Sequence, residues 1–415
     1  MIRRRVAITG LGLVSPYGDG AAPFFEHLLA GRSAVRYLQT DDKPRPLSMP
    51  FVSCTGFDPV AALGKPLAAM MERFAHLGVA AAFDAWQDAG LERLPADLEQ
   101  RNDWACIWGT ALGGIMAFEK GYRDMWQNGR ERLSPLGVVM GMNNAVNAHL
   151  SIQLGLGGVS MSHTVACSSS SVAIGEAFRR VRSGEATVAI TGGSDGTQTY
   201  GVARAWEAMR VMAPGDAQTA PQACRPFASD RAGLVLGEGG AALVLEAWEH
   251  AVARGATIHG EIVGYGTSCD HSHLVRPHQP GQVRALRAAL ADGRREWGRF
   301  DVRISGRAPM LRVVAALMNL RSRLTGIATG DQAMFVRRDA FDAIGGFPVQ
   351  PLMEDIELSR RLLRRSRPAC LRARVITSGR RWEQRGVWRT IVLMWRLRWA
   401  NWRGVPAEVL AEAYR

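Results

Sequence analysis

One cysteine, Cys167, lies in a segment whose pattern predicts a strand, a turn and then a helix. The segment, Thr164 to Phe178, reads TVACSSSSVAIGEAF, and the apolar residues after the cysteine follow a helical spacing: Ile174, Ala177, Phe178 and Val181. One helix face is therefore apolar, and Cys167 comes at the helix start. Unpaired backbone N–H groups and the helix dipole there favour a thiolate and can hold an oxyanion. The pattern predicts a nucleophile, with a buried, inert cysteine as the alternative.

A second cluster of reactive side chains lies further along the chain. In GYGTSCDHSHLVRPHQPG, Gly264 to Gly281, the residues Cys269, His271 and His273 alternate. On an extended segment they would share a face and could bind a metal ion. No further matched pair of ligands is evident, so we expect no metal. Two interpretations stay open: a surface loop with an ordinary histidine, and a neutral His273 that exchanges a hydrogen bond or proton with a thioester intermediate.

The elements that position these residues belong to a chain that alternates short β-branched runs with longer amphipathic stretches. This alternation predicts an α/β layered domain. Gly90 and Gly184 are expected to end the two main helices. We expect strands at Val6 to Gly10, Trp104 to Gly109, Ser160 to Val165, Thr187 to Gly192 and Ala241 to Leu245, and helices at Met71 to Ala89 and Ser169 to Arg182.

The amino terminus, MIRRRVAITGLGLV, imitates a signal peptide, because three arginines precede a short apolar run. We prefer a first buried strand, Val6 to Ile8, that runs into a glycine turn, since Gly10 and Gly12 interrupt the apolar stretch. No run of about 18 apolar residues exists, so we expect no membrane-spanning helix. Six cysteines without close pairs predict no disulfide framework, and the cytoplasm is the expected compartment.

The charge of the chain changes near residue 293. The last 122 residues hold 25 of the 51 Lys and Arg but only 11 of the 38 Asp and Glu, a net charge of +14, whereas residues 1–293 carry −1. The change falls at Ala291 to Phe300, without the linker composition that usually separates domains. This asymmetry excludes a uniformly basic nucleic-acid-binding protein and indicates two segments of different origin.

Five motifs in order make the first part resemble the beta-ketoacyl-acyl-carrier-protein synthases, condensing enzymes of the thiolase-like fold. The resemblance covers residues 1 to about 293. It implies a decarboxylative Claisen condensation of acyl and malonyl thioesters on acyl carrier protein, in fatty acid or polyketide-type synthesis. The motifs are VAITGLGLVSPYG, the Cys167 segment, TGGSD (Thr191 to Asp195), CRPFASDRAGLVLGEGGAALVLE (Cys224 to Glu246) and the His273 segment.

The resemblance also implies the roles of the two site residues. Cys167 would accept the acyl chain as a thioester, and its backbone N–H would form half of an oxyanion hole, a contact worth roughly 3 to 4 kcal/mol of barrier lowering. His273 corresponds to the first of the family's two active-site histidines and would stabilise the enolate oxygen. No cofactor is implied.

Other positions mix family residues with departures. Asp230, Arg231 and Glu238 match family positions that we interpret as structural. Ala228 and Ala232 stand where the family often has acids, which predicts a looser loop. After residue 293 the chain has neither Lys nor His. The family's second active-site histidine, its lysine and its glycine-rich loop with a phenylalanine gate are therefore missing, and we expect impaired activity.

Residues from about 294 onward resemble instead the C-terminal part of a family-2 glycosyltransferase, a partial glycosyltransferase-A-like α/β fragment. The resemblance implies that Glu354 and Asp355 lie at an acceptor site, with the aspartate as general base. The matching segments are WGRFDVRISG (Trp297 to Gly306), TGDQAMFVRRDAFDAIGGFP (Thr329 to Pro348), PLMEDIELSRRLLRR (Pro351 to Arg365) and SGRRWEQRGVW (Ser378 to Trp388).

The same resemblance assigns further residues to the acceptor and donor sites, but the family's metal-binding motif is missing. Gly345, Gly346 and Phe347 would shape the acceptor pocket, and Arg381 with Trp382 would lie near the donor phosphates. The family's metal-binding Asp-x-Asp does not occur after residue 293, which argues against glycosyl transfer. The alternative for the acidic pair is a helix first turn that complements the helix dipole.

The final helix carries an aromatic stripe beside a basic one. Arg389, Arg396 and Arg403 recur every seven residues. Three roles for this helix are ranked. The first is that the stripe packs against its own domain, and the second is that the helix lies on an anionic membrane surface. Nucleic-acid binding ranks third, because no recognised module is present. The stripe consists of Trp388, Ile391, Val392, Trp395, Trp399 and Trp402.

These observations predict two parts: residues 1–293, a beta-ketoacyl synthase N-terminal domain, and residues 294–415, a glycosyltransferase fragment. The leading hypothesis is an acyltransferase that acts through Cys167 and His273 on acyl carrier protein thioesters. The alternatives are a non-catalytic hybrid or misassembled gene product, and a glycosyltransferase remnant acting through Asp355. Each part would expose an apolar face, so we expect a homodimer or poor solubility. We expect no nucleic-acid partner.

Overall fold

The computed structural model describes residues 4–42, 44–196, 198–292, 296–306, 310–348, 350–378, 386–403, 405 and 407–414. The chain divides into two compact units, Met1–Val263 and Gly264–Arg415, and each is described by itself. The predicted family boundary at residue 293 lies outside the described residues and stays a prediction.

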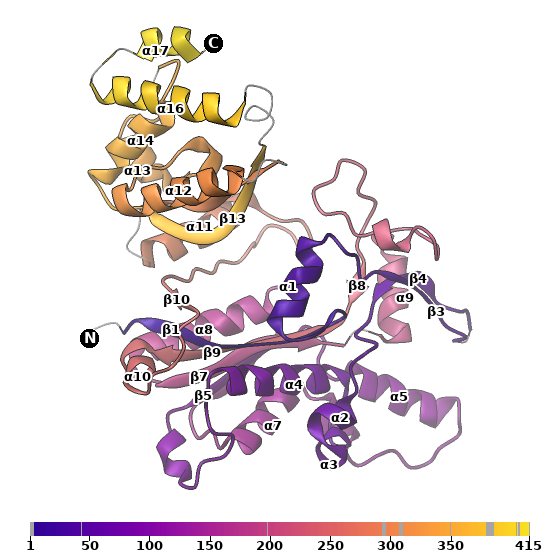
Figure 1. Cartoon of the computed structure of the whole chain (residues 1–415). Coiled ribbons are helices and arrows are strands. Elements are labelled where there is room, and N and C mark those ends of the chain that lie inside the picture. The colour runs from indigo at the N-terminus through magenta and orange to yellow at the C-terminus, as the bar shows by residue number, and fades with distance from the viewer. Residues whose placement is uncertain are drawn as a thin grey trace. The chain divides into compact units, whose positions relative to one another are not determined.

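A seven-stranded sheet forms the centre of the first unit (Figure 1). Its strand order is β10-β1-β9-β7-β5-β6, and β2 pairs with β1. Strands β5, β6 and β7 are mutually parallel where they pair, whereas β1 and β9 run antiparallel to their neighbours. The strands are β1 Val6–Ser15, β2 Gly18–Asp19, β5 Ala105–Gly109, β6 Ser160–His163, β7 Val188–Asp195, β9 Gly239–Ala247 and β10 Gly260–Ile262.

Helices cover both faces of this sheet, as the α/β layered prediction requires (Figure 1). Helix α4, Arg73–Asp88, lies across β1, β7 and β9 on one face, and α8, Ser169–Ser183, lies against β5 and β7 on the other. The predicted end of α8 is confirmed, because Gly184 adopts the left-handed conformation with φ 84°. Gly90, which follows α4, also has a positive φ, 66°.

The first strand is longer than predicted. We expected it to end in a glycine turn, but β1 continues through Gly10 and Gly12 to Ser15. The backbone of α4 passes directly over both glycines: a Cβ on Gly10 would lie 2.0 Å from the Ala85 carbonyl oxygen, and one on Gly12 would lie 1.9 Å from that of Ala81. These glycines allow close helix–sheet contact rather than a turn.

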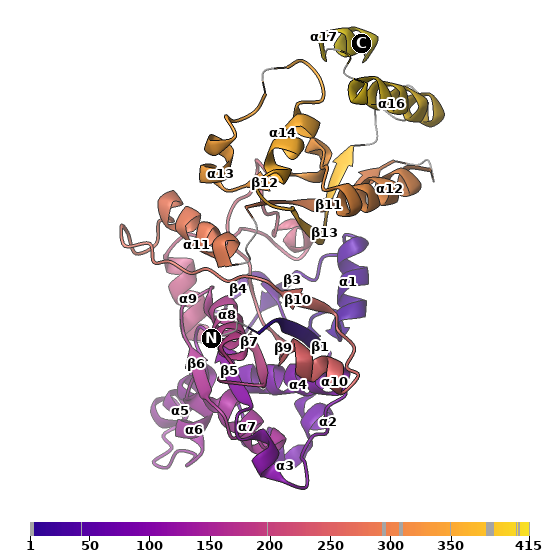
Figure 2. The same cartoon turned by 90° about the vertical axis from the view of Figure 1, so that its left-hand side faces the viewer.

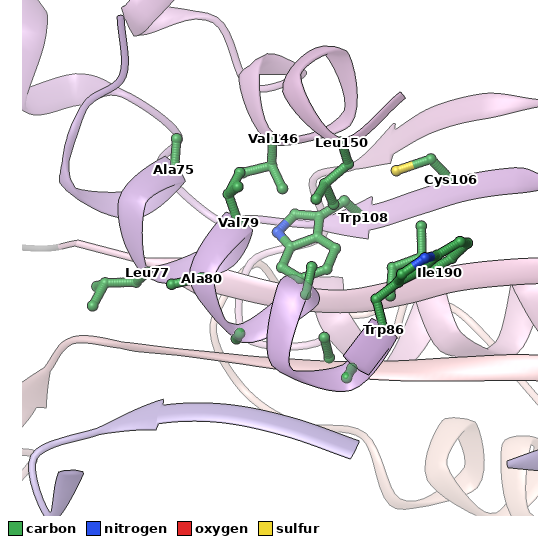
Figure 3. Close-up of a cluster of buried hydrophobic side chains, with 14 of the residues drawn as sticks. Ala75, Leu77, Val79, Ala80, Trp86, Cys106, Trp108, Val146, Leu150 and Ile190 are labelled. Carbon is green, nitrogen blue, oxygen red and sulfur yellow. The ribbon is translucent and has the colours of Figure 1, made fainter. Parts of the chain in front are cut away.

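The main core lies between α4, α7 (Ala145–Leu154) and the sheet. Figure 3 shows Trp108 of β5 among Val79 of α4 and Val146 and Leu150 of α7. All four side chains are fully buried. Trp108 also satisfies its indole N–H, which donates to the Ser194 hydroxyl at 3.1 Å. The indole therefore joins the apolar core to β7 without an unpaired donor.

Smaller elements surround this core. Strands β3 (Arg36–Gln39), β4 (Ser48–Val52) and β8 (Leu236–Gly237) form a second sheet in the order β3-β4-β8. The remaining helices are α1 Ala21–Leu29, α2 Pro59–Leu63, α3 Lys65–Ala68, α5 Ile115–Trp126, α6 Gly137–Gly141, α9 Tyr200–Ala208 and α10 Trp248–Ala253, with single 3₁₀ turns at Leu98–Arg101 and Ala220–Gln222.

The second unit contains a three-stranded sheet in the order β12-β11-β13. Strands β11 and β13 are parallel, and α12 packs on β11 (Figure 2). The elements are α11 Gln279–Asp292, β11 Trp297–Ser305, α12 Met310–Thr325, a 3₁₀ turn Gly330–Gln332, β12 Phe335–Val336, α13 Arg338–Ala343, α14 Glu354–Leu363, β13 Ala369–Ser378, α16 Val387–Trp402 and α17 Ala407–Tyr414.

The first-ranked expectation for the C-terminal helix is wrong. Its aromatic stripe does not pack inward: Trp388, Trp395 and Trp399 are more than half exposed. The side chains of α16 that join a core cluster are Leu393, Leu397 and Ala400 instead. Trp402's side chain lies outside the described residues. None of the described helices is long and apolar enough to cross a membrane.

Candidate active site

A tight turn places Cys167 between β6, which ends at His163, and α8, which begins at Ser169. Ala166 adopts a left-handed conformation with φ 48°. A non-glycine residue in that region costs on the order of 1 kcal/mol or more and persists only where surrounding contacts hold it. The turn before Cys167 is therefore a strained backbone segment at the predicted nucleophile.

Ser169 supplies the contacts that hold this turn. Its hydroxyl accepts a hydrogen bond from the Val165 N–H at 2.8 Å and donates one to the Ala166 carbonyl at 2.7 Å. The Ser169 N–H donates to the same carbonyl at 3.2 Å. Because Ser169 is only 3% exposed, water competes little with these bonds. The predicted helix start after Cys167 is confirmed, and its first residue fixes the preceding turn.

Two glycines, one at the end of β5 and one within β7, let the helix start lie close to the sheet. A Cβ on Gly109, the last residue of β5, would lie 2.3 Å from the carbonyl carbon of Ser169. A Cβ on Gly193 in β7 would lie 2.6 Å from the Ser170 Cβ. Any side chain at either position would displace the first turn of α8. The positions of both glycines thus determine where Cys167 sits.

Exposure separates Cys167 from the buried cysteines of the first unit. Cys167 is exposed, whereas Cys54 and Cys106 are buried. Burial raises the pKa of both buried thiols to about 12, with nearby Glu238 adding to the effect at Cys54. Neither buried thiol would form a thiolate near neutral pH. The interpretation of Cys167 as a buried, inert cysteine is therefore wrong, and its chemical role stays a prediction.

Asp195 is a residue of this region that the sequence interpretation did not single out. It ends β7, and its carboxylate accepts hydrogen bonds from the Thr110 hydroxyl and from the Ala111 and Leu112 N–H groups, all at 3.0 to 3.1 Å. It thereby fixes the loop that follows β5, the strand beside the start of α8. Its place at the end of the TGGSD motif was the available signal.

His273 lies on an exposed loop of the second unit. Its Nδ1 accepts hydrogen bonds from the Val275 N–H at 3.1 Å and the Arg276 N–H at 3.2 Å. An acceptor at Nδ1 leaves the proton of the neutral ring on Nε2. The loop therefore orients His273 as a donor through Nε2. Cys167 belongs to the first unit and His273 to the second.

The predicted structural residues have different environments. The buried Glu238 carboxylate accepts the Cys54 N–H at 2.8 Å and a two-pronged contact from Arg73, at 2.7 and 3.1 Å. It joins the residue directly before β9 to the first residue of α4, in keeping with a structural role. Asp230 and Arg231 are exposed and act locally: Asp230 pairs with Arg225, and Arg231 donates to the carbonyl of Ala228 at 2.9 Å. The sequence neighbours Ala228 and Ala232 are exposed or partly exposed.

In the second unit, Glu354 and Asp355 form the first turn of α14, as the helix-start interpretation predicts. Glu354 is exposed. The Asp355 carboxylate accepts the N–H of Gly330 at 2.8 Å, and its other oxygen accepts the N–H of Ile356 at 2.7 Å. A carboxylate that is held by two backbone N–H groups is fixed in orientation.

The other residues of the predicted acceptor site lie on the segment before α14. Gly345 and Gly346 both have positive φ, 78° and 74°. Phe347 is 56% exposed and packs edge-on against Phe341, with ring centroids 5.6 Å apart. Arg381 and Trp382, predicted near donor phosphates, lie outside the described residues.

Among the residues that the structure describes, no group of three His, Cys, Asp or Glu could hold a metal ion. A cavity of about 540 Å³ lies elsewhere in the first unit, and Cys167 is not among its lining residues. Its apolar walls come from α5 and α9 and include Phe118, Tyr122, Trp126 and Tyr200.

Comparison with known proteins identifies the class. The family model described as "Beta-ketoacyl synthase, N-terminal domain" matches residues 3–251. The chain is 39% identical over 291 residues to Nodulation protein E of Rhizobium sp. (strain N33), and 34% identical over 293 residues to 3-oxoacyl-[acyl-carrier-protein] synthase 2 of Staphylococcus aureus (strain COL). Each alignment covers 70% of this chain and 69% of the relative.

Solved structures agree with the sequence matches. A beta-ketoacyl synthase from Burkholderia phymatum STM815 is similar with a TM-score of 0.62 and 27% identity, over 78% of each chain. The ishigamide ketosynthase/chain length factor has a TM-score of 0.63 and 28% identity, over 75% of this chain and 77% of that one.

The chain belongs to the beta-ketoacyl synthase family and has its mixed α/β, thiolase-like fold. It is a condensing enzyme of the acyltransferase type, homologous to 3-oxoacyl-[acyl-carrier-protein] synthase 2. The resemblance found in its sequence motifs is thereby confirmed for the first part. None of these comparisons concerns a glycosyltransferase, so that resemblance stays a prediction.

Proposed function

We propose that this enzyme transfers an acyl chain from an acyl carrier protein to Cys167 and condenses it with a malonyl thioester. The observation that carries the proposal is the exposed Cys167 at a strained strand–turn–helix junction. The 3-oxoacyl-[acyl-carrier-protein] synthase 2 relative bears the carrier protein in its name, and the family's fold supports the reaction class.

The chemistry proceeds in two stages. The Cys167 thiolate attacks the acyl thioester carbonyl, and the carrier's thiolate leaves and takes up a proton. Malonyl thioester then loses carbon dioxide, and the resulting enolate carbon attacks the acyl carbonyl and expels the Cys167 thiolate. During the second stage, the Nε2–H of His273 donates to the enolate oxygen, because the loop occupies Nδ1 as an acceptor.

We expect the first stage to proceed better than the second. Acyl transfer needs the nucleophile and an oxyanion contact, and the Cys167 turn would supply the nucleophile and half of the oxyanion hole within the first unit. Condensation in the family also uses a second histidine, and residues after 293 contain none. Impaired condensation with intact acylation is therefore the expected behaviour of this chain.

Intact-mass analysis after incubation with acyl carrier protein thioesters tests the proposal. The wild-type chain should gain the mass of one acyl group, and Cys167→Ala should gain none. His273→Ala should still be acylated but should release less carbon dioxide from malonyl thioester. A folded wild-type sample that remains unacylated would contradict the proposal and favour a non-catalytic hybrid.

A transcript that runs through codons 285 to 300 in the source would count against misassembly of the gene.

The second candidate function is a glycosyltransferase remnant in which Asp355 acts as a base. Its support is the orientation of Asp355 by the Gly330 N–H, beside the exposed Glu354. Sugar-nucleotide hydrolysis that disappears in Asp355→Asn would favour the glycosyltransferase function. A chain that binds no sugar nucleotide would exclude it.

We also propose that the enzyme is a homodimer. Apolar exposure in the first unit supports self-association: Phe227 is fully exposed, and Trp126 is 72% exposed. Faces of this kind are covered by partners in stable proteins. Light scattering coupled to size exclusion should give twice the chain mass, and a monodisperse monomer would contradict the proposal.

A further inference from the structure

Helix α16 has a face that is committed to the core of the second unit. The helix lies beside α14 and α17 (Figure 1). Leu397 is 3% exposed and packs with Ile356 of α14 and Leu410 of α17. Leu393 and Ala400 pack against the same cluster. These contacts fix the rotation of the helix about its axis, so the direction in which its other side chains point is determined.

The outward face of α16 is aromatic. Trp388, Val392, Trp395 and Trp399 are 67%, 54%, 69% and 56% exposed. Their spacing of four, three and four residues keeps them in one stripe, because each residue turns the helix by about 100°. Three exposed tryptophans in a row are costly in water, since each leaves a large apolar surface uncovered.

A row of arginines runs beside this stripe. Arg389, Arg396 and Arg403 are all exposed, and each follows a stripe position by one or four residues. The Arg403 guanidinium lies 4.0 Å from the centre of the Trp399 ring. Between Gly386 and Val405 the sequence contains no Asp or Glu. The stripe is therefore flanked by positive charge that the helix itself does not neutralise.

We propose that this surface of α16 binds the headgroup region of an anionic phospholipid bilayer, with the helix lying in the membrane plane. Tryptophan suits that region because its ring is apolar and its N–H is polar, and arginine suits anionic headgroups. A second copy of the helix fits less well, since pairing would bring two arginine rows together without acidic partners. The inference goes beyond the condensing activity and does not rest on it.

The test is cosedimentation of the full chain with vesicles of phosphatidylcholine and of a phosphatidylcholine–phosphatidylglycerol mixture, without acyl substrate. Binding should be strong only with the anionic mixture. Replacing three arginines, in R389Q/R396Q/R403Q, should weaken it about fivefold per charge, on the order of 100-fold in all. W388S/W395S/W399S should abolish it.

Matched variants separate this surface from a general charge or tryptophan effect. R32Q/R132Q/R276Q removes the same charge from exposed positions elsewhere, and W126S removes an exposed tryptophan of the first unit. Both should bind like the wild type. Thermal melting of every variant checks that it is folded.

Three outcomes would overturn the proposal. A folded wild-type chain could fail to sediment with the anionic vesicles, or the tryptophan variant could bind as well as the wild type. The tryptophan variant could also change the oligomeric state without changing sedimentation, which would assign the stripe to a second copy. Acylation of Cys167 is measured in a separate assay, so the test of the condensing activity is independent of the test of membrane binding.

Discussion

The Ser169 hydroxyl donates a hydrogen bond of 2.7 Å to the carbonyl of Ala166, the left-handed residue directly before Cys167. Ser169→Ala removes this bond and the one accepted from the Val165 N–H. We expect a loss of about 0.5 to 1.5 kcal/mol in the free energy of unfolding, because two hydrogen bonds at the buried hydroxyl are lost while their backbone partners, on the exposed Val165 and Ala166, stay accessible to water. The rate of Cys167 acylation should also fall, as rapid-quench samples analysed by intact-mass spectrometry would show. Ser171→Ala, at an exposed position of the same helix, is the control; equal losses in both variants would refute the assignment.

Gly12 should tolerate no side chain. A Cβ there would lie 1.9 Å from the Ala81 carbonyl oxygen, so α4 would have to move away from β1. Overpacking of this kind costs about 1 to 3 kcal/mol or more, and urea unfolding of Gly12→Ala should show it. Gly56→Ala provides the comparison, since its Cβ would meet nothing within 4 Å. Similar stability of the two variants would contradict the close contact.

Glu72 should make the protein less stable as the pH rises. Burial raises the pKa of its carboxyl to about 7, and its Oε1 has no hydrogen-bond partner. The folded state then holds a proton that the unfolded state releases, so stability falls between about pH 4.5 and 7, by about 3 kcal/mol.

Glu72→Gln tests this dependence, because the amide stays neutral while it can still cap α4. Denaturant unfolding should find the variant more stable than the wild type near pH 8 and similar near pH 4. A difference between the two proteins that does not change with pH would show that the Glu72 carboxyl is not the titrating group.

Glu246 should have the opposite effect in acid. Burial by itself would raise the pKa of this carboxyl, but hydrogen bonds from Arg254, His250 and Thr9 outweigh it and lower the pKa to about 2. The stabilisation, about 3 kcal/mol, is present above the unfolded value of about 4.5 and disappears as the pH falls through 2. Arg254→Gln should therefore reduce stability at neutral pH and flatten its loss in acid, as circular dichroism during acid titration would measure. The exposed Arg32→Gln should leave the curve unchanged.

Alkylation should separate the cysteines by exposure. In the native protein near pH 8, iodoacetamide should label the exposed Cys167, Cys224 and Cys269, as peptide mass analysis would show. Cys54 and Cys106 should react only after unfolding, because burial raises the pKa of each thiol to about 12. Native labelling of either buried thiol before Cys167 would contradict the described packing.

Local sequence patterns predict much of the fold around Cys167. The apolar spacing after the cysteine places the start of α8 correctly, and Gly184 ends that helix as a C-terminal glycine should. The ordered motifs by themselves also indicate the condensing-enzyme family. These features depend on neighbours along the chain, so a linear pattern contains them.

Tertiary structure decided what depends on segments far apart in sequence. Gly12 lies in a strand rather than a turn because α4 crosses over it, and Asp195 holds a loop some 80 residues away along the chain, near Leu112. The aromatic stripe of α16 faces outward because a different set of side chains, including Leu397, fits the core better. Helical periodicity shows that a face is apolar, but only the packed partners determine whether that face is buried.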